Sequence, residues 1–104
     1  MKTISVDELN EMLQTGSEVQ LIDVRELTEY ETANIGGNHI PLAKVPTHTD
    51  QIKHDKKVVM ICRSGRRSAS AIEYLETQGY QNLYNLDGGL LAWKDEIDNT
   101  FDIE

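Results

Sequence analysis

VVMICRSGRRS, the stretch at residues 58–68, predicts three consecutive pieces of structure. The apolar and β-branched residues at 58–61 are typical of a buried strand. A short loop with one glycine follows, and apolar residues then recur at helical spacing, at Ala69, Ile72 and Leu75. The stretch therefore predicts a strand, a loop and a helix, with Cys62 at the end of the strand.

Cys62 is the only cysteine of the chain, and its position makes it a candidate nucleophile. Backbone N–H groups of the loop and the amino end of the following helix meet there, and both favour an anion. Three of the chain's four arginines lie within five residues of the thiol, namely Arg63, Arg66 and Arg67. Positive surroundings stabilise the reactive thiolate. We therefore interpret Cys62 as a reactive group rather than as a small apolar residue of the core.

The composition is that of an ordinary globular protein, and a length of 104 residues predicts one domain spanning 1–104. The formal net charge of −8 argues against binding to nucleic acid or to an anionic membrane, because both require a basic face. A cationic loop on an acidic body instead favours small anionic substrates. No apolar segment precedes the first helix signal, so a cytoplasmic protein is expected. One cysteine permits neither an internal disulfide nor a cysteine-based zinc site, and we predict no metal and no cofactor.

Helices and strands alternate along the rest of the chain. Ser5 and Glu8 fit a capping box, and Gly16 is placed to end the first helix. The remaining patterns predict a strand at 19–24, a short helix at 26–32, a turn at 36–37, a short helix at 49–54, a helix ending at 78, a strand at 83–86 and a last helix opening at 90. Such alternation predicts an α/β fold with a parallel sheet and helices on both faces. Ligands of these sheets bind beyond the carboxyl ends of the strands, where Cys62 falls.

Four ordered segments resemble the single-domain rhodanese family of sulfurtransferases, and together they span most of the chain. They are Ile22-Asp23-Val24-Arg25-Glu26 with Glu29-Tyr30-Glu31, then Ile40-Pro41-Leu42, then Cys62 to Ser68, then Leu86-Asp87-Gly88-Gly89 with Ala92-Trp93. The resemblance implies a five-stranded parallel sheet flanked by helices and a cysteine that alternates between thiolate and persulfide. It also implies that the loop from Cys62 to Arg67 wraps around the sulfur. The segment Ala33–Pro41 departs from the family pattern, being one residue shorter than the family's histidine-containing segment.

The expected chemistry is the transfer of a sulfane sulfur. The Cys62 thiolate attacks the outer sulfur of a donor such as thiosulfate, and the persulfide then passes its sulfur to cyanide, a thiol or a sulfur-relay protein. Without a second cysteine, the chain cannot resolve its own persulfide as an internal disulfide. The predicted substrate-binding residues are those whose N–H groups and side chains surround the sulfur: Arg63, Ser64, Gly65, Arg66, Arg67 and Ser68.

Several side chains near this motif have structural roles to weigh against functional ones. Ser68 either touches substrate or caps the following helix. One of the arginines is expected to pair with an acidic neighbour such as Glu73. Asp23 is expected to hydrogen-bond nearby backbone and Arg25 to pair with an acidic residue.

Two further aromatic side chains are His39, for which two roles are possible, and Trp93, for which a structural role is expected. His39 is either a base for Cys62 or a hydrogen-bonded loop residue. Trp93 is most simply an aromatic of the core or of a groove.

Two other functions compete with sulfur transfer. A cysteine phosphatase or arsenate reductase also places a thiolate in an anion-binding loop. The loop of such enzymes has the pattern of a cysteine, five residues and then an arginine. Here Ser68 occupies that position and Arg67 comes one residue earlier, so the shorter loop fits one sulfur better than a phosphate. The second alternative is a binding or regulatory module without turnover, and the retained thiol in its cationic loop argues against it.

Overall fold

The strand predicted to deliver the cysteine lies in the middle of a parallel sheet. This strand, β4 (Lys57–Ile61), pairs with β2 (Val19–Asp23) on one side and with β5 (Leu83–Leu86) on the other. Two short strands, β1 (Thr3–Ile4) and β3 (Asn38–His39), lie at the edges and complete the order β1-β5-β4-β2-β3. All four pairings are parallel, so the predicted α/β fold with a five-stranded parallel sheet is confirmed.

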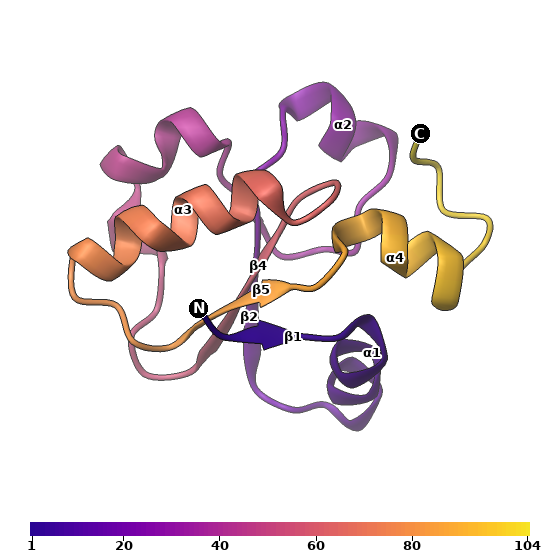
Figure 1. Cartoon of the computed structure of the whole chain (residues 1–104), viewed down its shortest axis with the longest axis horizontal. Helices are drawn as coiled ribbons and strands as arrows, with labels where there is room; N and C mark the ends of the chain where they lie inside the picture. The colour runs from indigo at the N-terminus through magenta and orange to yellow at the C-terminus, as the bar shows by residue number, and fades with distance from the viewer.

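Helices cover both faces of this sheet in the computed structural model, which describes residues 1–104 (Figure 1). Helices α1 (Val6–Thr15) and α4 (Gly89–Glu96) lie on one face and contact each other. Helix α3 (Arg66–Thr77) and the 3₁₀ helix Leu42–Thr47 cover the other face. The molecule is thus a sheet between two helical layers.

The side chains of β4 alternate between two cores. Val58 and Met60 point into the core beneath α3, and Cys62, which follows the strand, continues that face. Val59 and Ile61 point into the core beneath α1 and α4, where Trp93 is also buried, as predicted. Because both faces are covered, β4 is apolar along its whole length, which explains its unbroken hydrophobic sequence.

The predicted capping box of the first helix is confirmed. Ser5 Oγ accepts a hydrogen bond from the Glu8 N–H at 3.1 Å, and the Glu8 carboxylate accepts one from the Ser5 N–H at 3.2 Å. Gly16 ends the helix in the left-handed region at φ 73°, where glycine carries no steric penalty.

A further helix, α2 (Leu27–Thr32), follows β2 and lies within the predicted range 26–32. Other predictions differ from the structure. The expected helix at 49–54 is only a 3₁₀ turn at Thr49–Gln51, and the 3₁₀ helix at Leu42–Thr47 was not predicted. Pro46 within that segment removes a backbone donor, which disfavours an α-helix there. Strands β1 and β3 contain two residues each, too few for a hydrophobic period to appear.

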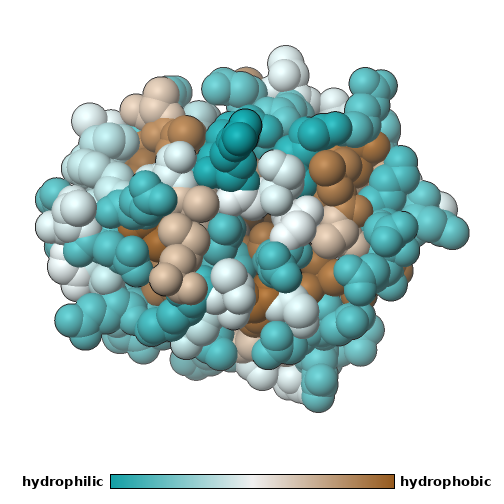
Figure 2. All heavy atoms as spheres, viewed as in Figure 1, coloured by the Kyte–Doolittle hydropathy of each residue, from teal (hydrophilic) through white to brown (hydrophobic).

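The face of the molecule in Figure 2 is mostly hydrophilic, and hydrophobic residues show there only in limited patches between polar ones. None of the helices combines the length and the apolar content needed to cross a bilayer.

Candidate active site

Cys62 lies directly after the central strand, inside a loop whose backbone turns its N–H groups toward the sulfur. The N–H of Gly65 donates to Sγ of Cys62 at 3.1 Å, and the N–H of Ser68 donates to it at 3.4 Å. Ser68 belongs to the first turn of α3, so the sulfur also lies at the positive end of this helix. Cys62 itself is 1% exposed. The two N–H groups and the helix end stabilise a negative charge on the sulfur. Because Cys62 is buried, only small reagents can reach its sulfur.

Helix α4 holds the loop from the other side. The N–H of Leu90 donates to the carbonyl of Cys62 at 3.0 Å, and the N–H of Leu91 donates to the carbonyl of Arg63 at 3.0 Å. These donors belong to the first turn of α4, whose N–H groups have no partner within their own helix. The loop carbonyls therefore serve as the cap of α4, and the two elements fix each other.

Gly89 is required for this contact. A Cβ at Gly89 would overlap the carbonyl oxygen of Arg63 and lie 2.7 Å from that of Cys62, and its φ of 61° favours glycine independently. This glycine therefore lets the loop backbone approach the start of α4.

A buried chain of hydrogen bonds joins the sulfur to strand β5. Ser68 Oγ lies 3.3 Å from Cys62 Sγ and donates to Asn85 Oδ1 at 2.5 Å, while Asn85 Nδ2 donates to the carbonyl of Gly65 at 2.9 Å. The last bond orients the amide, so its oxygen faces Ser68. Ser68 is thus directed to the sulfur and to β5, and the capping role considered for it is wrong: Gly65 occupies the cap position of α3.

One hydrogen on Ser68 Oγ has two possible acceptors in this chain. While the hydroxyl donates to Asn85, its oxygen can accept the S–H of a neutral Cys62 thiol. A thiolate has no hydrogen to give, so a hydrogen bond between these two side chains then requires the hydroxyl to donate to the sulfur instead of to Asn85. Asn85 lies beyond the motif that the sequence singled out, and no local pattern at 83–86 identifies it as part of the site.

The predicted arginines occupy different surroundings. Arg67 is half-buried and makes a bidentate pair with the Glu29 carboxylate of α2, at 2.7 and 2.9 Å. Arg63 is exposed and donates through Nε to the carbonyl of Glu104, whereas the exposed side chain of Arg66 makes no hydrogen bond within the chain. The expected arginine–acid pair therefore exists, but its acid is Glu29 rather than Glu73.

The ion pair changes the charge properties of both partners. The hydrogen bond from Arg67 lowers the pKa of Glu29 to about 2, from an ordinary value of 4.5. The same bond raises the pKa of Arg67, and the charge of Cys62 adds to this rise. The positive charge of Arg67 is thus close enough to interact with the sulfur, although its Nη1 and Nη2 are hydrogen-bonded to Glu29 of α2.

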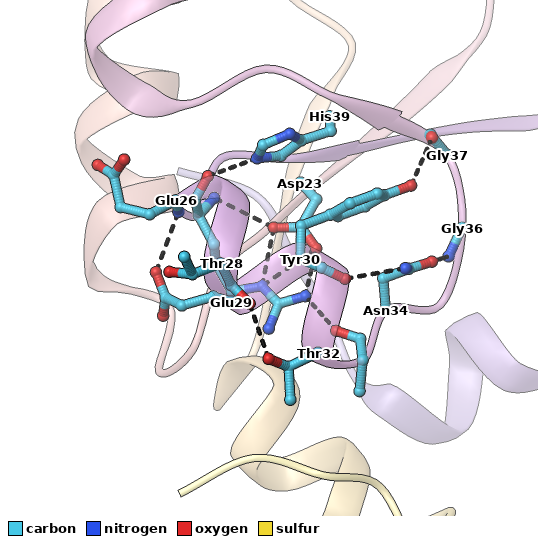
Figure 3. A network of polar contacts seen from close by, with 12 residues as sticks. Asp23, Glu26, Thr28, Glu29, Tyr30, Thr32, Asn34, Gly36, Gly37 and His39 are labelled. Carbon is cyan, nitrogen blue, oxygen red and sulfur yellow. Dashed lines mark hydrogen bonds and ion pairs between the residues drawn. The ribbon is translucent and has the colours of Figure 1, made fainter.

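Behind α2, a buried ion pair anchors the end of β2. The Asp23 carboxylate accepts from the backbone N–H of Arg25 at 3.1 Å and from its Nη2 at 2.8 Å. The backbone group predicted to bind Asp23 is thus that of Arg25, and the acidic residue predicted to pair with Arg25 is Asp23. Arg25 Nη2 also donates to the carbonyl of Ala33 at 2.8 Å. This network holds α2, and with it Glu29, against the sheet (Figure 3).

His39 belongs to this network and makes no hydrogen bond to Cys62. Its Nε2 lies 2.7 Å from the carbonyl of Arg25, and its ring stacks on that of Tyr30 with centroids 4.5 Å apart (Figure 3). The structural reading of His39 is therefore favoured over that of a base.

Comparison with known proteins gives a consistent result. A family model described as the rhodanese-like domain matches residues 5–96. A protein of Allochromatium vinosum named sulfurtransferase is 36% identical over 91 residues, covering 86% of this chain and 85% of that protein. The thiosulfate sulfurtransferase GlpE of Shewanella oneidensis is 34% identical over 96 residues, covering 88% and 91%. The crystal structure of a rhodanese-like domain protein from Staphylococcus aureus matches with a TM-score of 0.85 and 32% identity, covering 100% and 99%.

Proposed function

The chain belongs to the rhodanese-like domain family, and from that premise we propose that it transfers a sulfane sulfur through a persulfide on Cys62. The observation that carries the proposal is the pair of backbone N–H groups, from Gly65 and Ser68, directed at Sγ. Peptide N–H groups stabilise a charged sulfur without being consumed in the reaction.

In the first half-reaction, the Cys62 thiolate attacks the outer sulfur of a donor such as thiosulfate. A new sulfur–sulfur bond forms on Cys62, the donor's own sulfur–sulfur bond breaks, and sulfite leaves with the electron pair. The exposed Arg63 and Arg66 are proposed to bind the sulfonate oxygens of the donor, with Ser64 on the same rim.

In the second half-reaction, cyanide or a thiolate attacks the terminal sulfur of the persulfide. The bond to Cys62 breaks, and the cysteine leaves as the thiolate with which the cycle began. Because Cys62 is the only cysteine, the acceptor must be a separate molecule: a small thiol or a sulfur-relay protein.

The spacing of the loop supports sulfur transfer over phosphate chemistry. Only four residues separate Cys62 from Arg67, and Arg67 directs both terminal nitrogens to Glu29 rather than into the loop. A phosphatase would need guanidinium donors for the oxygens of a phosphate.

Intact mass after incubation with thiosulfate tests the proposal. We expect one added sulfur atom, removable by a reductant and absent from the Cys62→Ser variant, which should fold normally. A parallel assay compares thiocyanate formation from thiosulfate and cyanide with phosphate release from a phosphate ester. Phosphate release without thiocyanate would favour the phosphatase alternative, and sulfur transfer by Cys62→Ser would refute the assignment of the nucleophile.

A further inference from the structure

A strap, residues 97–104, follows α4 and turns back beside that helix toward α2 (Figure 1). Phe101 in the strap is 7% exposed and packs into the core beneath α1 and α4. Ile103 packs against the same core, and its carbonyl accepts a hydrogen bond from Nζ of Lys94, on α4, at 3.2 Å. The strap is therefore held against α4, and its acidic residues keep a defined place.

The end of the strap contacts the residue that follows the nucleophile. Nε of Arg63 donates to the carbonyl of Glu104, whereas Nη1 and Nη2 of Arg63 make no hydrogen bond within the chain. A cavity of about 450 Å³ lies between Arg63, α2 and the strap, and the side chains of Asp102 and Glu104 line it as well. The strap thus brings two acidic residues beside an arginine that still has donors for an anion.

The charges around this cavity are not balanced. Arg25 and Glu29, which also line it, are each paired with an opposite charge. Arg63, Asp102 and Glu104 are exposed and belong to no ion pair. One unpaired positive charge therefore shares the cavity with two unpaired negative charges, and the attraction of Arg63 for an anion is weakened.

We propose that Asp102 and Glu104 are specificity-determining residues that select sulfur donors by charge. A donor bound by Arg63 is repelled by both carboxylates, since charges in water interact over about 10 Å before salt screens them. The repulsion grows with the charge of the donor, so a dianion such as thiosulfate is disfavoured relative to a monoanion. The inference rests on the proposed sulfur transfer, in which Arg63 binds the oxygens of the donor.

Two donors that differ by one charge test the proposal. Thiosulfate is a dianion, and methanethiosulfonate presents the same outer sulfur with a single negative charge. In both reactions the Cys62 thiolate bonds to the outer sulfur and the sulfur–sulfur bond of the donor breaks. Sulfite or methanesulfinate then leaves with the electron pair. The charge preference is the kcat/KM for thiosulfate divided by that for methanethiosulfonate, both measured as thiocyanate formed with cyanide as the acceptor.

The double variant Asp102→Asn with Glu104→Gln removes both charges and keeps the size of the side chains. We expect the charge preference to rise about threefold at low ionic strength, mainly through a lower KM for thiosulfate. The rise should shrink as salt is added, because salt screens the repulsion. A displaced strap would not produce this salt dependence, so the measurement separates a charge effect from a structural one.

The control variant Glu11→Gln with Glu18→Gln makes the same change in net charge at two exposed positions. Glu11 lines a pocket with Lys57, the first residue of β4, and Glu18 directly precedes β2. Both therefore lie toward the end of the sheet opposite Cys62, and the control should leave the charge preference unchanged.

Three results would overturn the assignment of Asp102 and Glu104 while leaving sulfur transfer intact. They are an unchanged charge preference in the double variant, an equal rise in the control, and a rise that does not depend on salt. Failure of both donors to load sulfur onto Cys62 of the unmodified protein, followed by intact mass, would instead refute the proposed function itself.

Discussion

Ser68 and Asn85 lie 17 residues apart in the sequence, on α3 and β5, and share a hydrogen bond of 2.5 Å between two buried side chains. Through this bond the neighbouring strand controls the hydroxyl group that faces the sulfur of Cys62. The loop carbonyl of Gly65 is held by the same amide. Asn85 is thus a positioning residue for both the loop and the hydroxyl.

Replacing Ser68 with alanine should slow sulfur transfer. The variant loses the hydroxyl hydrogen that can turn from Asn85 to a Cys62 thiolate, so we expect kcat/KM to fall by about 10- to 100-fold. Iodoacetamide labelling of Cys62 at neutral pH should slow in parallel, because it reports the reactive thiolate. Ser70→Ala removes an exposed hydroxyl from the same helix and is the control. Unchanged transfer in Ser68→Ala would show that the backbone donors suffice.

Reversing the charge of Arg66 should weaken donor binding. Its side chain is exposed and makes no hydrogen bond within the chain, so it is free to attract an anion. We expect Arg66→Glu to raise the KM for thiosulfate several-fold with little change in kcat, and the effect should shrink with added salt. Lys53→Glu makes the same change in net charge at an exposed site away from the loop. An equal rise in KM for both variants would point to net charge alone.

Removing the carboxylate of Glu29 should destabilise the protein only where that carboxylate is ionised. Its pKa is lowered to about 2 from 4.5, so its contribution is present in full above pH 4.5 and is lost as pH falls through 2. Because the pair is partly solvated, we expect Glu29→Gln to cost about 1 kcal/mol or less at pH 7. Urea denaturation of both proteins at pH 7 and near pH 2 should show the difference vanishing in acid. A difference independent of pH would contradict the ion-pair account.

Gly89→Ala and Gly16→Ala form a matched pair. Both glycines have a left-handed backbone, but a Cβ at Gly16 meets nothing within 4 Å, whereas one at Gly89 overlaps the Arg63 carbonyl. We expect Gly16→Ala to cost about 1 kcal/mol and to leave activity intact. Gly89→Ala should cost about 3 kcal/mol or more and should displace the loop, with loss of sulfur transfer. Thermal denaturation and the sulfur-loading assay measure the two effects, and equal costs would exclude the clash.

The sequence predicted what depends on short-range pattern. The capping box of Ser5 and Glu8, the apolar run of β4 and the cysteine loop each carry their signal within a few neighbouring residues. The central layers of the fold and the candidate nucleophile follow from those signals. Strands β1 and β3 do not, because two residues reveal no period and each strand forms only by pairing with a longer one.

The site residues that escaped prediction are those supplied from distant positions. Glu29 belongs to a segment that resembles the family, but it lies 38 residues from Arg67, and no sequence spacing indicates that the two side chains pair. Asn85 lies within a strand that the sequence identified, but its contact with Ser68 depends on the register between β5 and α3. Such partners appear only when the chain is folded.

Two of the groups that hold the sulfur of Cys62 are peptide N–H groups, which every residue except proline possesses. The side chains at 63, 64 and 66 point outward and take no part in that hold. Mutation can therefore exchange the outer rim and redirect the chain toward a new donor or acceptor while the reactive centre persists. In the proposed site, different atoms carry the chemistry and the selectivity, so evolution could alter one without rebuilding the other.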